Sequence, residues 1–235
     1  MRFVDKGNEP RELQDFKQAN RKTPQNLRYD ALDARIKHAL REQMLREQGA
    51  VCAYTMEAIG RSEAADCHVE HIRPQSADEA NELDCRNMVL CAPGNSDLAQ
   101  ADWGANKKGG AEVDENNFVS PLNRNCETRL KFGANGDVRS ANPEDTAAGD
   151  TIDLLNLNHR RLLDARSILI REYGLGAETR KPLTTSQAER LDAEIMRLDA
   201  HGWAQPYCVA IKQVAERYAR KRKARAARRR SPKDA

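Results

Sequence analysis

The sequence predicts an α+β fold: a small β-β-α unit with an added β-hairpin, surrounded by helices and followed by a helical C-terminal half. Short β-type runs are confined to the middle of the 235-residue chain, between residues 51 and 139. Stretches with apolar residues at helical spacing lie before and after them. Charged residues make up 32% of the chain and aromatic residues 5%, which is typical of a helix-rich protein with a modest core.

Residues 1–50 are expected to form an N-terminal helical segment. The first part is polar and irregular, with one short helical candidate near Arg11–Asn20. Within Tyr29–Gln48 apolar residues recur at helical spacing. Gly49 closes this predicted helix, because glycine readily adopts the left-handed conformation that is common at helix ends.

Residues 51–149 are expected to hold the β-β-α unit. Val51–Met56 is predicted to be a strand, with Cys67–Ile72 as its antiparallel partner. A short buried run follows at Met88–Cys91, and a helix that opens at Asn106–Lys108 completes the unit.

The same region ends in a predicted β-hairpin. Its strands are Glu127–Phe132 and Asp137–Arg139, and Asn135-Gly136 between them is a strong turn signal.

Residues 150–216 are expected to be helical. One helix is predicted from Asp150 to Gly174, and a second follows a capping box at Ser186–Glu189. A third continues into a basic tail at residues 217–235. The net charge is +3, but the tail has ten Lys or Arg against one acid, so it carries +9 and the remainder −6. Such a tail favours contact with nucleic acid. A solubilising helix end and a docking segment for an acidic protein are the alternatives.

The chain is expected to be cytoplasmic, with no membrane contact. It has no run of about eighteen apolar residues, and its N-terminus lacks the apolar core of a secretion signal. That location argues against disulfides among its six cysteines. Structural zinc is not expected, because Cys52-Ala53-Tyr54-Thr55 and Cys91-Ala92-Pro93-Gly94 each supply one sulfur instead of two. A mixed site stays open as an alternative, with the ligands Cys52, Cys67, Cys85 and Cys91.

Candidate catalytic chemistry is concentrated at Glu70-His71. His71 is predicted to be the general base, since histidine titrates near neutral pH and its neutral ring can take a proton from water. Glu70 is predicted to bind a divalent cation, Mg²⁺ or Mn²⁺, which prefer oxygen ligands and stabilise charge on phosphate. The alternative is a strand end whose two polar residues face solvent.

Residues on either side are expected to complete this site. Asn106 is predicted to be a second metal ligand, with a helix N-cap as the alternative. Asn87 is predicted to position the catalytic loop by hydrogen bonds to His71, although it could be only a turn residue. The predicted substrate contacts are Lys107, Lys108, Arg73 and His68. The lysines could instead be solvated, and His68 could be an ordinary strand histidine. An acid-His pair, a central Asn and a later Asn followed by Lys is the order of an HNH (ββα-metal) nuclease site.

These residues identify a family resemblance. The chain resembles the HNH endonuclease subunit of Septu-type and retron-associated antiphage defence systems over roughly residues 25–175. The likeness is most specific in the Glu-His strand with its Pro-Gln-Ser ending. The matching segments are Cys52-Ala53-Tyr54-Thr55, His68 to Ser76, Gly104 to Lys108, Val119 to Leu122, Cys126-Glu127, the hairpin, and Leu154 to Asn158.

The resemblance implies a nuclease that works beside an ATPase subunit of the ABC/SMC-like class. It also implies a branch without the zinc ribbon, since Thr55 stands where a knuckle would have sulfur. Where the family pattern has a third His, this chain has Asn106, as in HNN variants of the motif. DNA is the favoured substrate, because most HNH sites cut DNA, and RNA such as tRNA stays open. A catalytically weak subunit that binds the ATPase and nucleic acid is the competing hypothesis.

Overall fold

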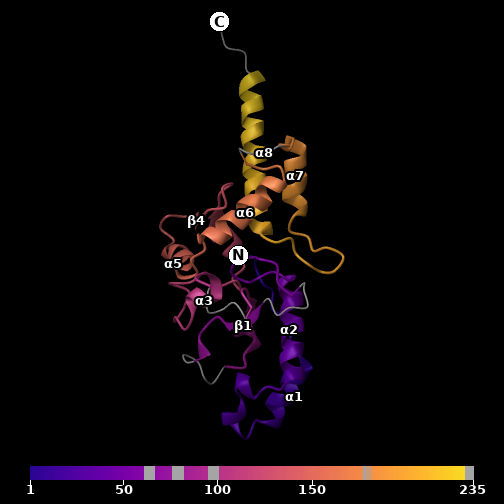
Figure 1. Ribbon diagram of the computed structural model, residues 1–235, viewed down its shortest axis with the longest axis vertical. Helices are drawn as coiled ribbons and strands as arrows, with labels where there is room; N and C mark the ends of the chain where they lie inside the picture. The colour runs from indigo at the N-terminus through magenta and orange to yellow at the C-terminus, as the bar shows by residue number, and fades with distance from the viewer. Residues whose placement is uncertain (61–66, 76–81, 95–100, 177–178, 180, 231–235) are drawn as a thin grey trace.

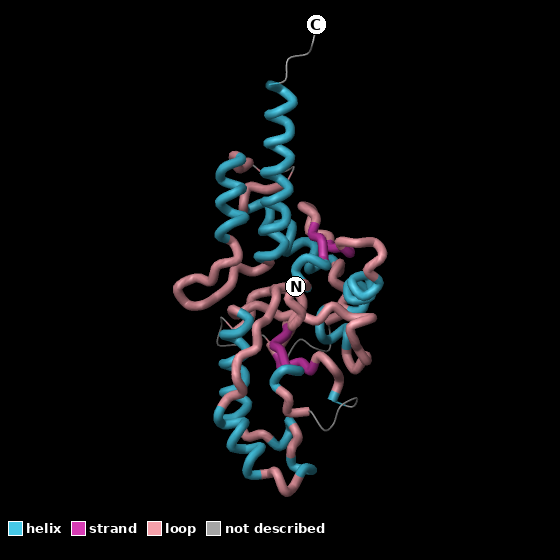
Figure 2. Tube along the Cα trace, turned by 180° about the vertical axis from the view of Figure 1, so that it is seen from behind, coloured by secondary structure: helices cyan, strands magenta, loops and turns pink. Residues whose placement is uncertain are grey.

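The computed structural model describes residues 1–60, 67–75, 82–94, 101–176, 179 and 181–230. Within these ranges the protein has an α+β fold with two small antiparallel sheets. Strand β1 (His68–His71) pairs with β2 (Met88–Cys91), and β3 (Leu130–Phe132) pairs with β4 (Val138–Ser140). Helices lie at both ends of an elongated molecule, with the two sheets between them (Figures 1 and 2).

Both predicted N-terminal helices form, but the second begins at Ala34 instead of Tyr29. Helix α1 (Arg11–Ala19) packs against α2 (Ala34–Gln48), and two 3-10 turns, Pro24–Asn26 and Tyr29–Ala31, lie between them. The Asp33 side chain caps α2 by accepting a hydrogen bond from the Ile36 amide, 2.9 Å away. The helix ends at Gly49, whose φ of 63° is the left-handed conformation.

Gln48, the last residue of α2, connects this helix to the central sheet. Its buried amide group donates to the Leu90 carbonyl (2.9 Å) and accepts from the Leu90 amide (2.7 Å). Gln48 therefore satisfies backbone groups of β2, a strand whose four residues are all buried. This contact sets the position of the sheet that carries the candidate site.

The predicted strand at Val51–Met56 is wrong, and so is its pairing with Cys67–Ile72. The partner of β1 is β2, with Glu70 opposite Val89 and His71 opposite Met88. Residues 51–58 form a tight turn instead, closed by a bridge between Val51 and Ala58. The φ angles of Ala50 and Met56 are 52° and 65°, which a continuous strand cannot accommodate.

The predicted hairpin forms, with a shorter first strand. Residues Cys126–Arg129 are a single helical turn, α4, and β3 begins at Leu130. Gly136 in the turn has φ 87°, and a side-chain carbon there would lie 2.3 Å from the Leu163 carbonyl oxygen. The turn is held by the buried Arg166 guanidinium, which donates to the carbonyls of Gly136 and Leu157 at 2.6 Å each.

The C-terminal half is helical, but its segmentation differs from the prediction. Instead of one helix from Asp150 to Gly174 there are two, α5 (Thr146–Leu154) and α6 (Arg160–Glu172). The chain breaks between them at Asn156, which has φ 44°. Helix α7 (Thr185–Glu194) begins with a capping box formed by Thr184 and Gln187, two residues earlier than predicted.

The last helix, α8 (Cys208–Arg230), packs on α6, α7 and β3 before it extends away from the body (Figure 1). Its Gln213 side chain accepts from the Phe132 amide (3.1 Å) and donates to the Leu130 carbonyl (2.8 Å). The helix is therefore fixed to the outer edge of β3. None of the helices in the described ranges has the length and apolar character that a membrane crossing requires.

Candidate active site

The candidate site lies where β1 ends, and Asn87 braces the loop that leaves it. Asn87 closes the 3-10 turn Cys85–Asn87 immediately before β2. Its carbonyl accepts from the Ile72 amide at 2.8 Å. Its side chain accepts from the Arg73 amide (2.8 Å) and donates to the Arg73 carbonyl (2.9 Å). Asn87 thus positions the loop through the backbone of Arg73, two residues beyond His71.

Replacing Asn87 with alanine is expected to lower the free energy of unfolding by about 1–3 kcal/mol, because both backbone groups of Arg73 lose a partner. Chemical denaturation followed by circular dichroism measures this loss. Arg86→Ala is the matched control, because Arg86 is the exposed neighbour in the same 3-10 turn, so its loss should be smaller. Unchanged stability in Asn87→Ala would show that these bonds do not hold the loop.

His71 is held in one tautomer by a backbone contact. Its Nε2 lies 2.9 Å from the Glu82 carbonyl oxygen, and because a carbonyl only accepts, Nε2 carries the proton. Nδ1 is then the unprotonated nitrogen of the neutral ring. Burial lowers the pKa of His71 below its usual 6.5, although the bond to Glu82 opposes that shift. The ring is therefore a neutral base at physiological pH.

Glu82 is a positioning residue that the sequence did not indicate, because it contacts His71 through its backbone carbonyl. It is 5% exposed. Its carboxylate accepts from the Tyr29 amide (2.8 Å) and from the Gln75 side chain (3.2 Å). The Tyr29 ring in turn meets the His71 ring edge to face, with centroids 5.6 Å apart. Glu82 therefore holds Tyr29 in place, and the ring of Tyr29 packs against His71.

Glu70 is paired with a buried ammonium group. The Lys108 Nζ lies 2.7 Å from the Glu70 carboxylate, and it also donates to the carbonyls of His71 (3.2 Å) and Gly109 (3.3 Å). The Lys108 side chain is 1% exposed and the Glu70 side chain 13%. Burial raises the pKa of Glu70, and the positive charge of Lys108 counteracts this. The predicted role of Lys108 as a phosphate contact does not fit its burial.

The short helix α3 (Gly104–Lys108) explains why Lys108 reaches Glu70. Side chains two positions apart on a helix point to nearly opposite sides, so Asn106 does not share the direction of Lys108. The Asn106 amide nitrogen donates instead to the Ala101 carbonyl. The exposed Lys107 pairs with Asp102 at 2.8 Å. The structure therefore does not bring the Asn106 side chain to Glu70 as the sequence predicts.

The oxygen atoms around Lys108 have the chemistry of a site for a hard cation. A carboxylate and two carbonyls surround one positive charge, and oxygen ligands of this kind suit Mg²⁺ or Mn²⁺. The buried Tyr54 hydroxyl lies beside Glu70, and it has no hydrogen bond of ordinary geometry within the part of the chain that the structure describes. A divalent cation at Glu70 would take the place of the Lys108 ammonium. Glu70 belongs to no group of three His, Cys, Asp or Glu side chains that could hold a metal ion in the described ranges, so such an ion would depend on carbonyl ligands as well.

The remaining predicted substrate contacts, Arg73 and His68, do not line the cleft that Glu70 and His71 share. Glu70 and His71 line one cleft of about 480 Å³, together with Tyr29 and Gly109. Arg73 is exposed and lines a neighbouring cleft of about 420 Å³ that also includes Asn87.

His68 is tied to the loop after β2, because its Nδ1 lies 2.7 Å from the Pro93 carbonyl oxygen. That bond matches the alternative of a half-buried strand histidine.

The cysteines are all buried and reduced. Cys52 Sγ accepts from the amides of Thr55 (3.4 Å) and Ala92 (3.3 Å). Burial raises the pKa of the Cys52 thiol, but hydrogen bonds from Cys91 and Thr55 outweigh burial and bring it down to about 7. In the described ranges no three His, Cys, Asp or Glu side chains are grouped for a metal ion, so the mixed four-cysteine alternative finds no support there.

Comparison of the chain with models of known protein families, and with curated proteins, gives no match.

Proposed function

We propose that this protein is an endonuclease of the HNH type that hydrolyses phosphodiester bonds in nucleic acid. The observation that carries the proposal is the cleft at the end of β1, because both Glu70 and His71 line it and burial lowers the pKa of His71. Asn87 fixes the loop beyond this pair, and α3 packs its Lys108 against it. A strand pair followed by a short helix, with an acid and a base at the strand end, supports a ββα nuclease centre.

His71 supplies the base in this proposal. Nδ1 takes a proton from a water molecule, the resulting hydroxide attacks phosphorus, and the bond to the leaving oxygen breaks. Glu82 holds the ring in the tautomer that leaves Nδ1 free for this step. A divalent cation, Mg²⁺ or Mn²⁺, held by Glu70 would stabilise the negative charge that develops on the phosphate oxygens.

DNA is the proposed substrate, with RNA as the alternative for the same site. The resemblance to the nuclease subunit of antiphage systems supports an ABC/SMC-like ATPase as partner, and it supports the cytoplasm as the place of action. One observation favours the second hypothesis of a catalytically weak binding subunit. Lys108 already neutralises Glu70, so the cation position is filled by the chain itself.

Incubation of the purified protein with supercoiled plasmid and with total RNA tests the proposal. We expect nicking and linearisation of the plasmid with Mg²⁺ or Mn²⁺, and none with a chelator. Cleavage of RNA alone would move the substrate from DNA to RNA. Binding of either nucleic acid without cleavage under all these conditions would favour the binding subunit over the nuclease.

A further inference from the structure

A second concave surface lies far along the chain from the Glu70-His71 cleft. It is a groove of about 540 Å³ between the β3-β4 hairpin and α8. Two cationic side chains reach it from the hairpin, Lys131 and Arg139, and two from the helix, Arg217 and Lys221. We call this surface the hairpin groove.

The charge in the hairpin groove is not neutralised by its own lining. Among the described residues that form it there is no carboxylate. Lys131, Arg139 and Lys221 make no salt bridge within the described chain. Four like charges around one hollow repel one another, so the groove is complementary to an anion with several charges.

The pKa of Arg217 is lowered in part by a neighbouring positive charge of the groove. Burial lowers the pKa of Arg217, Glu216 opposes the shift, and the positive charge of Arg139 lowers it further. Glu216 and Asp137 are the acids that act on Arg217, and neither lines the groove. A bound anion would relieve the repulsion between Arg139 and Arg217.

The groove is built on fixed walls. Gln213 joins α8 to β3 through the Phe132 amide and the Leu130 carbonyl, and Arg217 donates to the Phe132 carbonyl. On the other side of α8, the Tyr218 hydroxyl donates to the Leu183 carbonyl at 2.9 Å. The cationic side chains are thus presented by a backbone that needs no rearrangement to bind.

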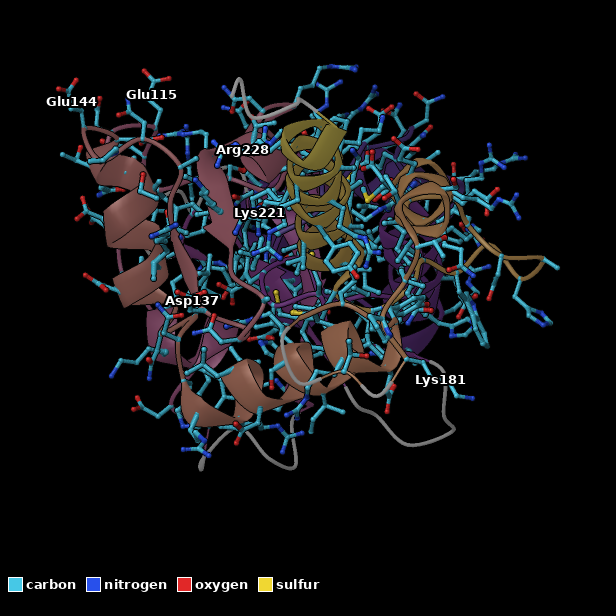
Figure 3. The ribbon with its side chains drawn as sticks, turned by 90° about the horizontal axis from the view of Figure 1, so that it is seen from above. Glu115, Asp137, Glu144, Lys181, Lys221 and Arg228 are labelled. Carbon is cyan, nitrogen blue, oxygen red and sulfur yellow. The ribbon has the colours of Figure 1, made fainter. Side chains whose placement is uncertain are left out.

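The positive surface continues beyond the groove along α8. Between Arg217 and Arg230 the helix has nine Lys or Arg and no acid. Lys221 and Arg228 are seven positions apart, so they lie on one side of the helix. Figure 3 shows both on the side that faces the hairpin. Arg217, Lys221 and Arg228 therefore form a basic stripe that leads out of the groove.

We propose that the hairpin groove and the stripe on α8 bind the phosphodiester backbone of nucleic acid, independently of sequence. A regular row of phosphates matches a row of cations, and the release of condensed counterions drives such binding. The Phe132 side chain is 2% exposed, so its ring is not free to stack on bases. The inference rests on the proposed function, because the groove would hold the polymer that the Glu70-His71 cleft cuts.

A triple variant, Lys131→Ala, Arg139→Ala and Lys221→Ala, tests the groove in full-length protein that also carries His71→Ala, so that the probe is not cut. The probe is a short fluorescent DNA duplex of random sequence. We expect binding to weaken by about tenfold or more, and the slope of log affinity against log salt to fall by about 2 to 3 units.

The matched control removes three exposed cations in or next to α7, the helix that flanks α8 and does not line the groove, through Lys181→Ala, Arg190→Ala and Arg197→Ala. Figure 3 shows Lys181 away from Lys221. The control has the same net charge as the groove variant and should bind the duplex like its parent. Equal losses in both variants would mean that only net charge matters, and no loss in the groove variant would remove the groove from nucleic-acid binding. Either result overturns the inference.

Two further measurements separate this inference from its alternatives. Polyglutamate as a competitor should displace the duplex poorly, whereas displacement at equal charge would assign the groove to acidic proteins instead. In protein with His71 intact, the groove variant should hydrolyse bis(p-nitrophenyl) phosphate at the parental rate, since that ester is too small to span the groove. Failure of hydrolysis in both parent and variant would count against the nuclease, while the binding result would still decide the groove.

Discussion

His71→Ala is expected to reduce plasmid cleavage by about two to four orders of magnitude, the range that a positioned general base contributes. In the proposed mechanism Nδ1 is the proton acceptor, and alanine has no group to replace it. Initial rates of nicking at neutral pH measure the effect. Circular dichroism should show an unaltered fold, because the His71 side chain is only half-buried.

His38→Ala is the matched control for this variant, because His38 is an exposed histidine on α2. It should cleave at the parental rate. Cleavage that persists unchanged in His71→Ala would remove this residue from the mechanism.

The pH dependence of cleavage is a second test of His71 as the general base. In the proposed mechanism His71 acts when neutral, so activity should be full above the pKa of His71 and fall as pH drops through that pKa. Because burial lowers the pKa of His71 below 6.5, the acid limb of the rate profile should lie below pH 6.5. A limb centred above 6.5 would indicate another base.

Lys108→Met is expected to lower the free energy of unfolding by about 3–5 kcal/mol, since removing one partner of a buried ion pair leaves the other charge uncompensated. Denaturant titration in the presence of a chelator measures this loss. Lys107→Met is the matched control, because Lys107 is the exposed neighbour on α3, and it should cost about 1 kcal/mol or less. The double variant Glu70→Gln with Lys108→Met should recover most of the lost stability.

The same variant tests whether the oxygens around Lys108 accept a divalent ion. If Mn²⁺ takes the place of the ammonium group, Mn²⁺ should raise the melting temperature of Lys108→Met and leave that of the double variant unchanged. Any ligand that binds only the folded state stabilises it in this way. An equal response of both variants to Mn²⁺ would exclude Glu70 as the ligand.

Elements set by local signals could be predicted from the sequence. Helix α2 has regular apolar spacing and ends at Gly49, and the hairpin has its Asn-Gly turn. The strand at Val51–Met56 was not predictable as a turn, because its composition is that of a strand. Its left-handed residues, Ala50 and Met56, are neither glycine nor asparagine.

The candidate site was predictable only where it is local in sequence. Glu70-His71 at a strand end and Asn87 as a loop brace follow from neighbouring residues. The contact between Lys108 and Glu70 depends on which face of α3 lies toward β1. Tertiary packing determines this rotation of the helix. The contact of Glu82 with His71 is made by a backbone carbonyl. Every residue has such a carbonyl, so the residue type does not indicate this contact.

The bond between Gln213 and β3 has a consequence for assembly. A strand at the margin of a sheet presents unpaired amides and carbonyls, and these invite strands from other molecules. In this hairpin β4 covers one margin of β3, while the Gln213 side chain engages the Phe132 amide and the Leu130 carbonyl on the other. A strand of a second copy therefore cannot pair with this margin of β3. The carboxamide of one glutamine thus protects β3 against intermolecular β-pairing.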